Sequence, residues 1–140
     1  MYFKDKYVIG VHYRGTDKFM AMNGTEDLKH SKHKNYQEVI NEIKKEYSDT
    51  SVLFVASDEQ PFVDTCKKQF ENVCSYTTSR SNISTSGIQL DTKKCVNYTE
   101  HSDCKKLKEI ERQSIHRGNN SIDPYKKGED SVIDIWLLSY

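Results

Sequence analysis

The sequence of 140 residues has no long apolar run, little proline and glycine, and no excess of either charge. No stretch approaches the ~18 consecutive apolar residues of a membrane-spanning helix, and neither a signal peptide nor a transit peptide is expected at the start. Two prolines and six glycines are too few for a fibrous chain or a linker. The 21 basic and 21 acidic residues cancel, so the charge balance does not favour a nucleic-acid-binding protein.

What is present is typical of one polar globular domain. Hydrophobic residues make up 35% of the chain and charged residues 30%, which is poorer in apolar residues than an ordinary domain. An aromatic content of 11% argues against wholesale disorder. We therefore expect residues 1–140 to form a single domain or part of one.

Three short apolar segments predict strands. Residues 7–12 read as a buried parallel strand, residues 51–56 give the strongest strand signal, and residues 73–77 give a weaker one. A helical pattern separates each strand from the next. The order β-α-β-α-β predicts a Rossmann-like α/β domain with a parallel sheet and right-handed crossovers.

The two helices between these strands are predicted from apolar residues at helical spacing. The first runs from Tyr36 to Tyr47. Ser57 or Asp58 is expected to cap the second, with Pro61 in its first turn. Its expected apolar face consists of Phe62, Val63, Cys66 and Phe70.

The second half of the chain is less regular. Residues 103–117 are expected to form a charged helix closed by Gly118. The apolar stretch 132–138 is interpreted as a helix entered through an acidic turn, although its length also fits a strand. A doubly wound sheet normally continues with another strand, so we expect the domain to be truncated.

Four cysteines leave three interpretations open. A disulfide bond between Cys95 and Cys104 is the more plausible pairing, and free thiols are the commonest outcome. A zinc site built from Cys95, His101 and Cys104 lacks a fourth ligand. The cellular compartment stays open.

The strongest chemical signal follows the first strand. His12, Arg14, Asp17 and Lys18 lie within seven residues, where ligands of open α/β sheets bind. The guanidinium of Arg14 matches a phosphate, and Lys18 adds a second positive charge. Gly15 allows close approach of the backbone to a ligand, and Asp17 can orient either cation, accept from a hydroxyl group, or simply pair with Arg14. The segment is neither a Walker P-loop nor a dinucleotide-binding loop.

The segment from His12 to Lys18 resembles the first signature of the fucosyltransferase superfamily. That superfamily includes the α1,6-fucosyltransferases, the nodulation fucosyltransferases and the protein O-fucosyltransferases, in which a strand leads into His-x-Arg-Arg-Thr-Asp-Lys. Here Gly15 stands where many members have a second arginine. Residues 52–59 and 128–139 resemble two further segments of the family, in the same order.

The resemblance implies the nucleotide-binding half of a GT-B glycosyltransferase, either as a fragment of a longer protein that is inactive by itself or as a degenerate copy. Its activity would be an inverting, metal-independent transfer of fucose from GDP-fucose to a glycan or protein acceptor, with no cofactor. Carried over, Arg14 would hold the pyrophosphate and stabilise the negative charge of the leaving GDP. His12 would shape the same pocket, and Asp58 and Asp134 would lie near the guanosine. Tyr36 resembles a tyrosine of the family's first helix.

Two other functions remain as alternatives. One is a non-catalytic module that binds GDP, another nucleotide or a protein partner. The other is a phosphoryl-transfer or hydrolase domain, which is less favoured because the sequence lacks both a P-loop and a Ser/His/Asp order. Asp58 also has a structural alternative, since a residue of this type after a strand is often a helix N-cap.

Overall fold

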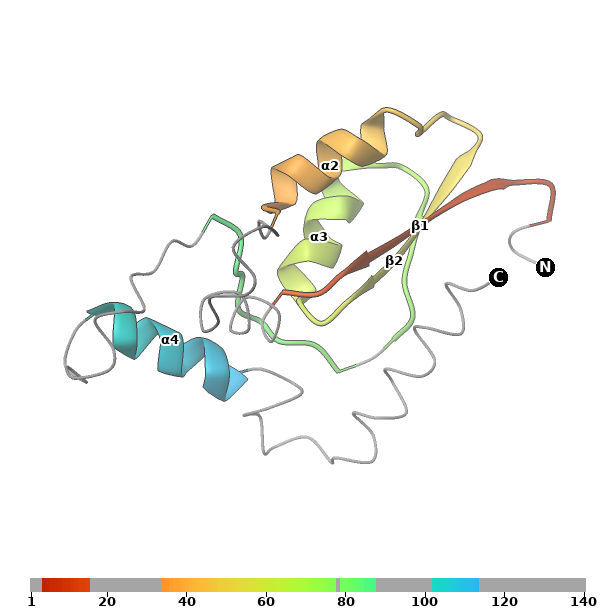
Figure 1. Ribbon diagram of the computed structural model, residues 1–140. Coiled ribbons are helices and arrows are strands. Elements are labelled where there is room, and N and C mark those ends of the chain that lie inside the picture. Colours follow the sequence, from red (N-terminus) through yellow and green to blue (C-terminus); the bar gives the residue numbers. More distant parts are fainter. Residues whose placement is uncertain (1–3, 16–33, 78, 88–101, 114–140) are drawn as a thin grey trace, which may run out of the picture.

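The computed structural model describes residues 4–15, 34–77, 79–87 and 102–113 (Figure 1). In chain order its elements are β1 (Tyr7–Tyr13), α2 (Tyr36–Lys44), β2 (Ser51–Ser57), α3 (Gln60–Gln69), β3 (Val73–Cys74) and α4 (Ser102–Gln113). The strands form one parallel sheet in the order β1-β2-β3. The predicted α/β class and parallel sheet are confirmed, and the described part is compatible with a fragment of a Rossmann-like domain. Within it, no helix is both long and apolar enough to span a bilayer.

The sheet is built around β2. β1 pairs with β2 along its whole length, from Tyr7 opposite Ser51 to Tyr13 opposite Ser57. β3 contributes only two residues to the pairing, so the predicted strand 73–77 is shorter than expected. β2 is buried throughout because it lies between the other two strands.

The prediction that β1 is a buried strand is wrong for much of its length. Tyr7 is 57% exposed and Val8 is 39% exposed. Among the described strands β1 pairs with β2 alone, so it is an edge strand. Its β-branched sequence is nevertheless typical of an interior strand. Its last residue, Tyr13, is buried again where the strand enters the core.

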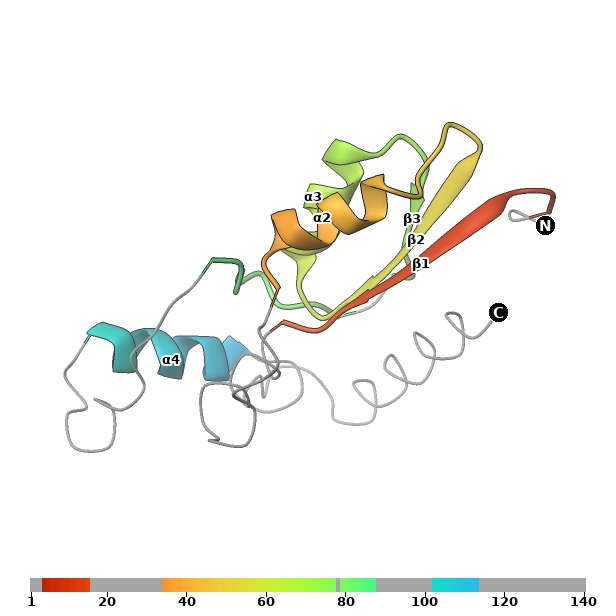
Figure 2. The same ribbon diagram turned by 45° about the horizontal axis from the view of Figure 1, so that its top comes forward.

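α2 and α3 lie side by side on one face of the sheet (Figures 1 and 2). Sequential strands joined by crossovers of one hand place successive helices on the same face, so the order β1-β2-β3 requires this arrangement. The core forms between the helices and the sheet. Its buried members are Tyr13, Tyr36, Ile40, Ile43, Leu53, Val55, Phe62, Val63, Cys66 and Phe70.

α2 begins at a complete capping box. Asn35 Oδ1 accepts a hydrogen bond from the backbone N–H of Glu38 at 2.9 Å, and Glu38 Oε2 accepts from the backbone N–H of Asn35 at 2.8 Å. The helix ends at Lys44, three residues before the predicted end at Tyr47. Tyr47 still packs on Phe70, with ring centroids 4.7 Å apart.

The predicted cap of α3 is wrong. The N-cap residue is Glu59, and its side chain makes no capping hydrogen bond. Pro61 lies in the first turn, as expected. The carboxylates of Asp58 and Glu59 point instead to other segments, where they make the contacts described below.

α4 occupies residues 102–113, where the charge pattern predicts a helix. Figures 1 and 2 show it off the end of the sheet at which β1 and β2 terminate. The end of this helix predicted at Gly118 and the predicted element 132–138 lie outside the described residues.

Cys104 takes part in a disulfide bond, while Cys66 and Cys74 are free thiols. Cys95, the partner predicted from the spacing, lies outside the described residues. A zinc site on Cys104 is excluded, because zinc binds the free thiolate.

Candidate functional site at the carboxyl ends of β1 and β2

The segments that follow β1 and β2 meet at one edge of the sheet. The two strands are parallel and their last residues, Tyr13 and Ser57, are paired, so both chains leave the sheet at the same level. The backbone N–H of Gly15 donates a hydrogen bond of 2.8 Å to Asp58 Oδ1. The structure thus brings together two segments that the sequence marked separately, 43 residues apart.

Four of the predicted site residues lie in the described part of the chain. Gly15 and Asp58 are buried and in contact, and Arg14, half-buried, directly precedes Gly15. His12 is exposed and pairs with Ala56 within the sheet. Because side chains alternate along a strand and Tyr13 enters the core, His12 lies on the face opposite α2 and α3. The remaining predicted residues, Asp17, Lys18 and Asp134, lie outside the described residues.

Glu59 accepts more hydrogen bonds than any other side chain described at this edge. Its side chain is fully buried. Thr85 donates to Glu59 Oε1 from its hydroxyl at 2.6 Å, and the backbone N–H of Thr85 donates to both carboxylate oxygens at 3.2 and 3.3 Å. The hydroxyl of Tyr36 donates to Oε2. One carboxylate therefore ties the end of β2 to the start of α2 and to the segment 79–87.

Sequence reasoning selected Asp58 and treated Glu59 only as the end of a family-like segment. The available signal was the position of a second acidic residue directly after a fully apolar strand. That signal does not say what each of the two carboxylates contacts, since neighbouring side chains leave the backbone in different directions. The distinction depends on Tyr36 and Thr85, which come from other parts of the chain.

The environment of Glu59 disfavours its charge. Burial is the main cause that raises the pKa of this carboxyl above its usual range, and the nearby Asp58 raises it further. The hydrogen bonds from Thr85 and Tyr36 oppose the rise in pKa only in part. Burial likewise raises the pKa of the Tyr13 and Tyr36 hydroxyls, so both tyrosines are neutral hydrogen-bond donors at physiological pH. A perturbed carboxyl in such a position is a general feature of functional sites.

Three aromatic rings form the base of this region. Tyr13 and Phe62 are stacked with ring centroids 4.4 Å apart, and Tyr36 meets both rings edge-on at 5.3 and 5.2 Å. The hydroxyl of Tyr13 donates to the carbonyl oxygen of Lys34 at 3.1 Å. The rings thus join the end of β1 to the first turns of α2 and α3.

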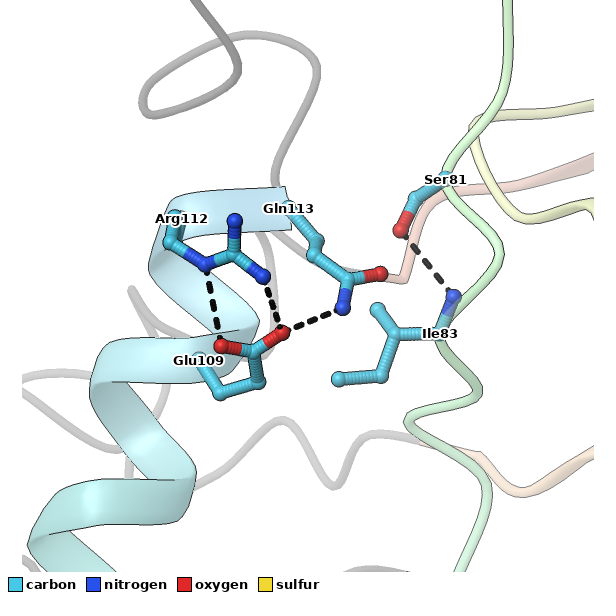
Figure 3. Close-up of polar contacts among 5 residues, drawn as sticks. All are labelled: Ser81, Ile83, Glu109, Arg112 and Gln113. Atoms are coloured by element: carbon cyan, nitrogen blue, oxygen red, sulfur yellow. Dashed lines mark hydrogen bonds and ion pairs between the residues drawn. The ribbon is translucent and has the colours of Figure 1, made fainter.

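The segment 79–87 closes the network from the side of β2. Ser81 and Glu59 form a parallel bridge, in which the N–H of Ser81 donates to the carbonyl of Asp58 at 2.7 Å and the N–H of Gln60 donates to the carbonyl of Ser81 at 2.8 Å. The hydroxyl of Ser81 then accepts from the N–H of Ile83 in a tight turn (Figure 3). The segment is therefore held to the junction of β2 and α3 by its backbone.

Arg80 places a cation at the end of β2 that sequence reasoning missed. Its guanidinium donates to the carbonyl oxygens of Ser57 at 3.1 Å and Tyr76 at 2.5 Å, and to Gln60 Oε1 at 3.4 Å. The only sequence signal was a single arginine in a run of serines and threonines. These contacts assign Arg80 a structural role, in which it joins the carboxyl end of β2 to the segment after β3.

The site offers neither an activated thiol nor a preformed metal cluster among the residues that the structure describes. Burial raises the pKa of the Cys66 thiol to about 12, which keeps it protonated and unreactive. No group of three histidine, cysteine or acidic side chains gathers in metal-binding geometry within those ranges. The described residues thus place a half-buried arginine, Arg14, next to Gly15, whose neighbours Asp58 and Glu59 are both buried.

Comparison with family models, with curated proteins and with solved structures finds no match for the chain.

Proposed function

We propose that this chain carries the donor-binding part of a glycosyltransferase of the fucosyltransferase type, which binds GDP-fucose in the manner of the nucleotide-binding half of a GT-B enzyme. The observation that carries the proposal is the hydrogen bond between Gly15 and Asp58 at the carboxyl ends of two parallel strands. This edge is where open α/β sheets bind nucleotides. It is also where the start of the first family-like segment and the end of the second, at Gly15 and Asp58, are in contact.

In this proposal Arg14 is the catalytic residue. Cleavage of the sugar–phosphate bond leaves negative charge on the departing GDP, and a fixed guanidinium stabilises that charge more in the transition state than in the ground state. The family-like role of Arg14 needs no metal ion. Transfer to the acceptor hydroxyl also needs a base, and none of the described residues is assigned that role.

The test is calorimetric titration with GDP and GDP-fucose. Hydrogen bonds to charged groups contribute about 1.5–3 kcal/mol, so Arg14→Ala is expected to weaken GDP binding by roughly tenfold to a hundredfold. Arg112→Ala is the matched control, because Arg112 is an exposed arginine paired with Glu109 on α4. Equal GDP affinity in wild type and Arg14→Ala, or no GDP binding by the wild type, would refute the proposal.

A second candidate, a GDP-binding module without catalytic activity, is favoured by one specific observation. Gly15 stands where many family members have a second arginine, and the side chain of Glu59 fills the space beside it. A single arginine can suffice for binding a diphosphate while stabilising a leaving group poorly. As a donor-binding fragment the chain alone is expected to turn over no GDP-fucose, so release of free fucose from GDP-fucose by the chain, detected by chromatography, would exclude the binding module.

A further inference from the structure

Gly15 is packed against the side chain of Glu59 more closely than any other residue type permits. A Cβ atom built on Gly15 would lie 1.9 Å from Oε1, 2.2 Å from Cδ and 2.9 Å from Cγ of Glu59. Real contacts of a Cβ atom are longer than 3.0 Å. Space is therefore what requires glycine at position 15.

An exposed glutamate side chain would move aside at little cost, but Glu59 is fixed at its far end. Its Oε1 accepts from the Thr85 hydroxyl, its Oε2 accepts from Tyr36, and the N–H of Thr85 reaches both oxygens. The side chain is fully buried as well. To displace the carboxylate, a substitution at Gly15 must break hydrogen bonds that have no water to replace them.

The same short stretch of backbone is held on its other side by Asp58, which accepts from the Gly15 N–H at 2.8 Å. The peptide that joins Arg14 to Gly15 thus lies between two neighbouring acidic residues, one binding its N–H and the other touching the Cα. Arg14 shares that peptide. The two contacts therefore restrain the backbone directly after the Cα of Arg14.

We propose that Glu59 is the positioning residue of the Arg14 site, and that it restricts position 15 to glycine so that a single arginine of this loop faces the anion. This inference rests on the proposed function, because it concerns how the diphosphate of the donor is held. It adds a specificity element to that function: Arg14 supplies the one guanidinium at positions 14 and 15, and a second cation at position 15 disrupts the site.

The sharpest test is to add the missing arginine. A new positive charge beside a diphosphate ordinarily strengthens binding. Here Gly15→Arg is expected to weaken GDP binding by about tenfold or more, because the side chain displaces Glu59 and moves Arg14. Gly15→Ala, which adds no charge, is expected to lower the affinity similarly. Tighter GDP binding by Gly15→Arg would overturn the inference.

Rescue separates positioning from general loss of structure. Glu59→Asp shortens the side chain by one methylene group and draws the carboxylate back from position 15, which relieves the closest contact, that with Oε1. The double variant Gly15→Ala, Glu59→Asp is expected to bind GDP more tightly than Gly15→Ala. Gly87→Ala is the matched control: Gly87 has a φ of +71°, and a Cβ there meets nothing within 4 Å. An alanine at position 87 is strained by the backbone conformation and not by Glu59, so Glu59→Asp does not relieve that strain.

Two readouts distinguish failure of this inference from failure of the proposed function. GDP binding by the wild type tests the function, and its absence ends both proposals. If the wild type binds and Gly15→Ala binds equally well, only the positioning role is overturned. The salt dependence of GDP affinity gives a further check. If the guanidinium of Arg14 no longer reaches the diphosphate in Gly15→Ala, the salt dependence of this variant is expected to fall to that of Arg14→Ala. An unchanged salt dependence in a folded Gly15→Ala variant would contradict the inference.

Discussion

Glu59, at the end of β2, and Glu109, on α4, each accept hydrogen bonds from three donor groups, but their pKa values are displaced in opposite directions. The donors to Glu59 are two hydroxyls and a backbone amide. Those to Glu109 are the Nε and Nη2 of Arg112, at 3.0 and 2.7 Å, and the side-chain amide of Gln113, at 2.5 Å (Figure 3). Burial raises the pKa of Glu59, whereas Arg112 and Gln113 lower the pKa of Glu109 to about 2.

The difference shows that hydrogen bonding alone does not determine the state of a carboxyl group. The side chain of Glu109 is 43% exposed and faces a cation, so water and charge both favour its ionised form. Glu59 is fully buried among neutral donors and beside Asp58, so the loss of water outweighs its hydrogen bonds. A surface pair of this kind contributes little to folding, while a buried network joins segments that are distant in sequence.

The largest expected effect on stability comes from truncating Glu59, the buried one of the two glutamates. Glu59→Ala leaves the Tyr36 hydroxyl and both Thr85 donors without their acceptor and opens a cavity, so we expect a loss of about 3 kcal/mol or more in the free energy of unfolding. Urea denaturation followed by circular dichroism measures it. Glu109→Ala is the control, and its midpoint is expected to match the wild type. Equal midpoints for the two variants would remove the contrast.

The pH dependence of stability sharpens the comparison. A carboxyl whose pKa is raised on folding binds its proton more tightly in the folded state. Its contribution to the free energy of unfolding is therefore fully present below the unfolded pKa of about 4.3, and it is lost as the pH rises through the folded pKa. A tenfold difference in proton affinity between the folded and unfolded chain corresponds to about 1.4 kcal/mol of stability. The groups that act on Glu59 are Asp58, Tyr36, Tyr13 and Thr85.

Glu59→Gln mimics the protonated carboxyl and removes this dependence. We expect the stability of the variant relative to the wild type to increase as the pH rises from about 4.3 towards neutrality. Denaturation midpoints of both proteins measured across that range provide the test. A difference that stays constant with pH would show that Glu59 has the same pKa in the folded and unfolded chain.

The smallest expected effect on stability comes from the exposed group on α4 formed by Glu109, Arg112 and Gln113. The depressed pKa of Glu109 gives a contribution that is present above a pH of about 4.3 and is lost as the pH falls towards the folded value of about 2. Because the pair is solvent-exposed, we expect Glu109→Gln to leave the thermal midpoint at neutral pH unchanged, at low salt and at about 1 M salt, where screening is nearly complete. Differential scanning calorimetry is the measurement, and a marked drop in the midpoint at low salt would mean that the cluster contributes to the fold.

Much of the architecture around these two residues follows from local patterns. The apolar run 51–56 predicts β2 because a strand buried on both faces needs no polar alternation. The spacing of Tyr36, Ile40 and Ile43 predicts the helix that covers it. The exposure of β1 was missed because its run Tyr7–Val11 is as apolar as that of an interior strand, and only the number of neighbouring strands distinguishes the two.

The candidate site was predictable to a lesser degree. Arg14 and Gly15 stand out in the sequence because charge follows directly on an apolar strand, and Asp58 stands out for the same reason. The sequence favoured Asp58 as a helix cap or a ligand contact, whereas its carboxylate accepts from Gly15. Glu59, Thr85 and Arg80 were missed as parts of one site, because each depends on a contact with a segment more than twenty residues away.

By itself the sequence determined the order of strands and helices along the chain and the polar residues that follow β1 and β2, since these depend on periodicity and on neighbours along the chain. Only the tertiary structure decided what the two buried carboxylates of Asp58 and Glu59 bind, why position 15 is glycine and that much of β1 is exposed. The physical reason is that burial, and with it the cost of a charge or of an added methyl group, depends on what the rest of the folded chain places nearby.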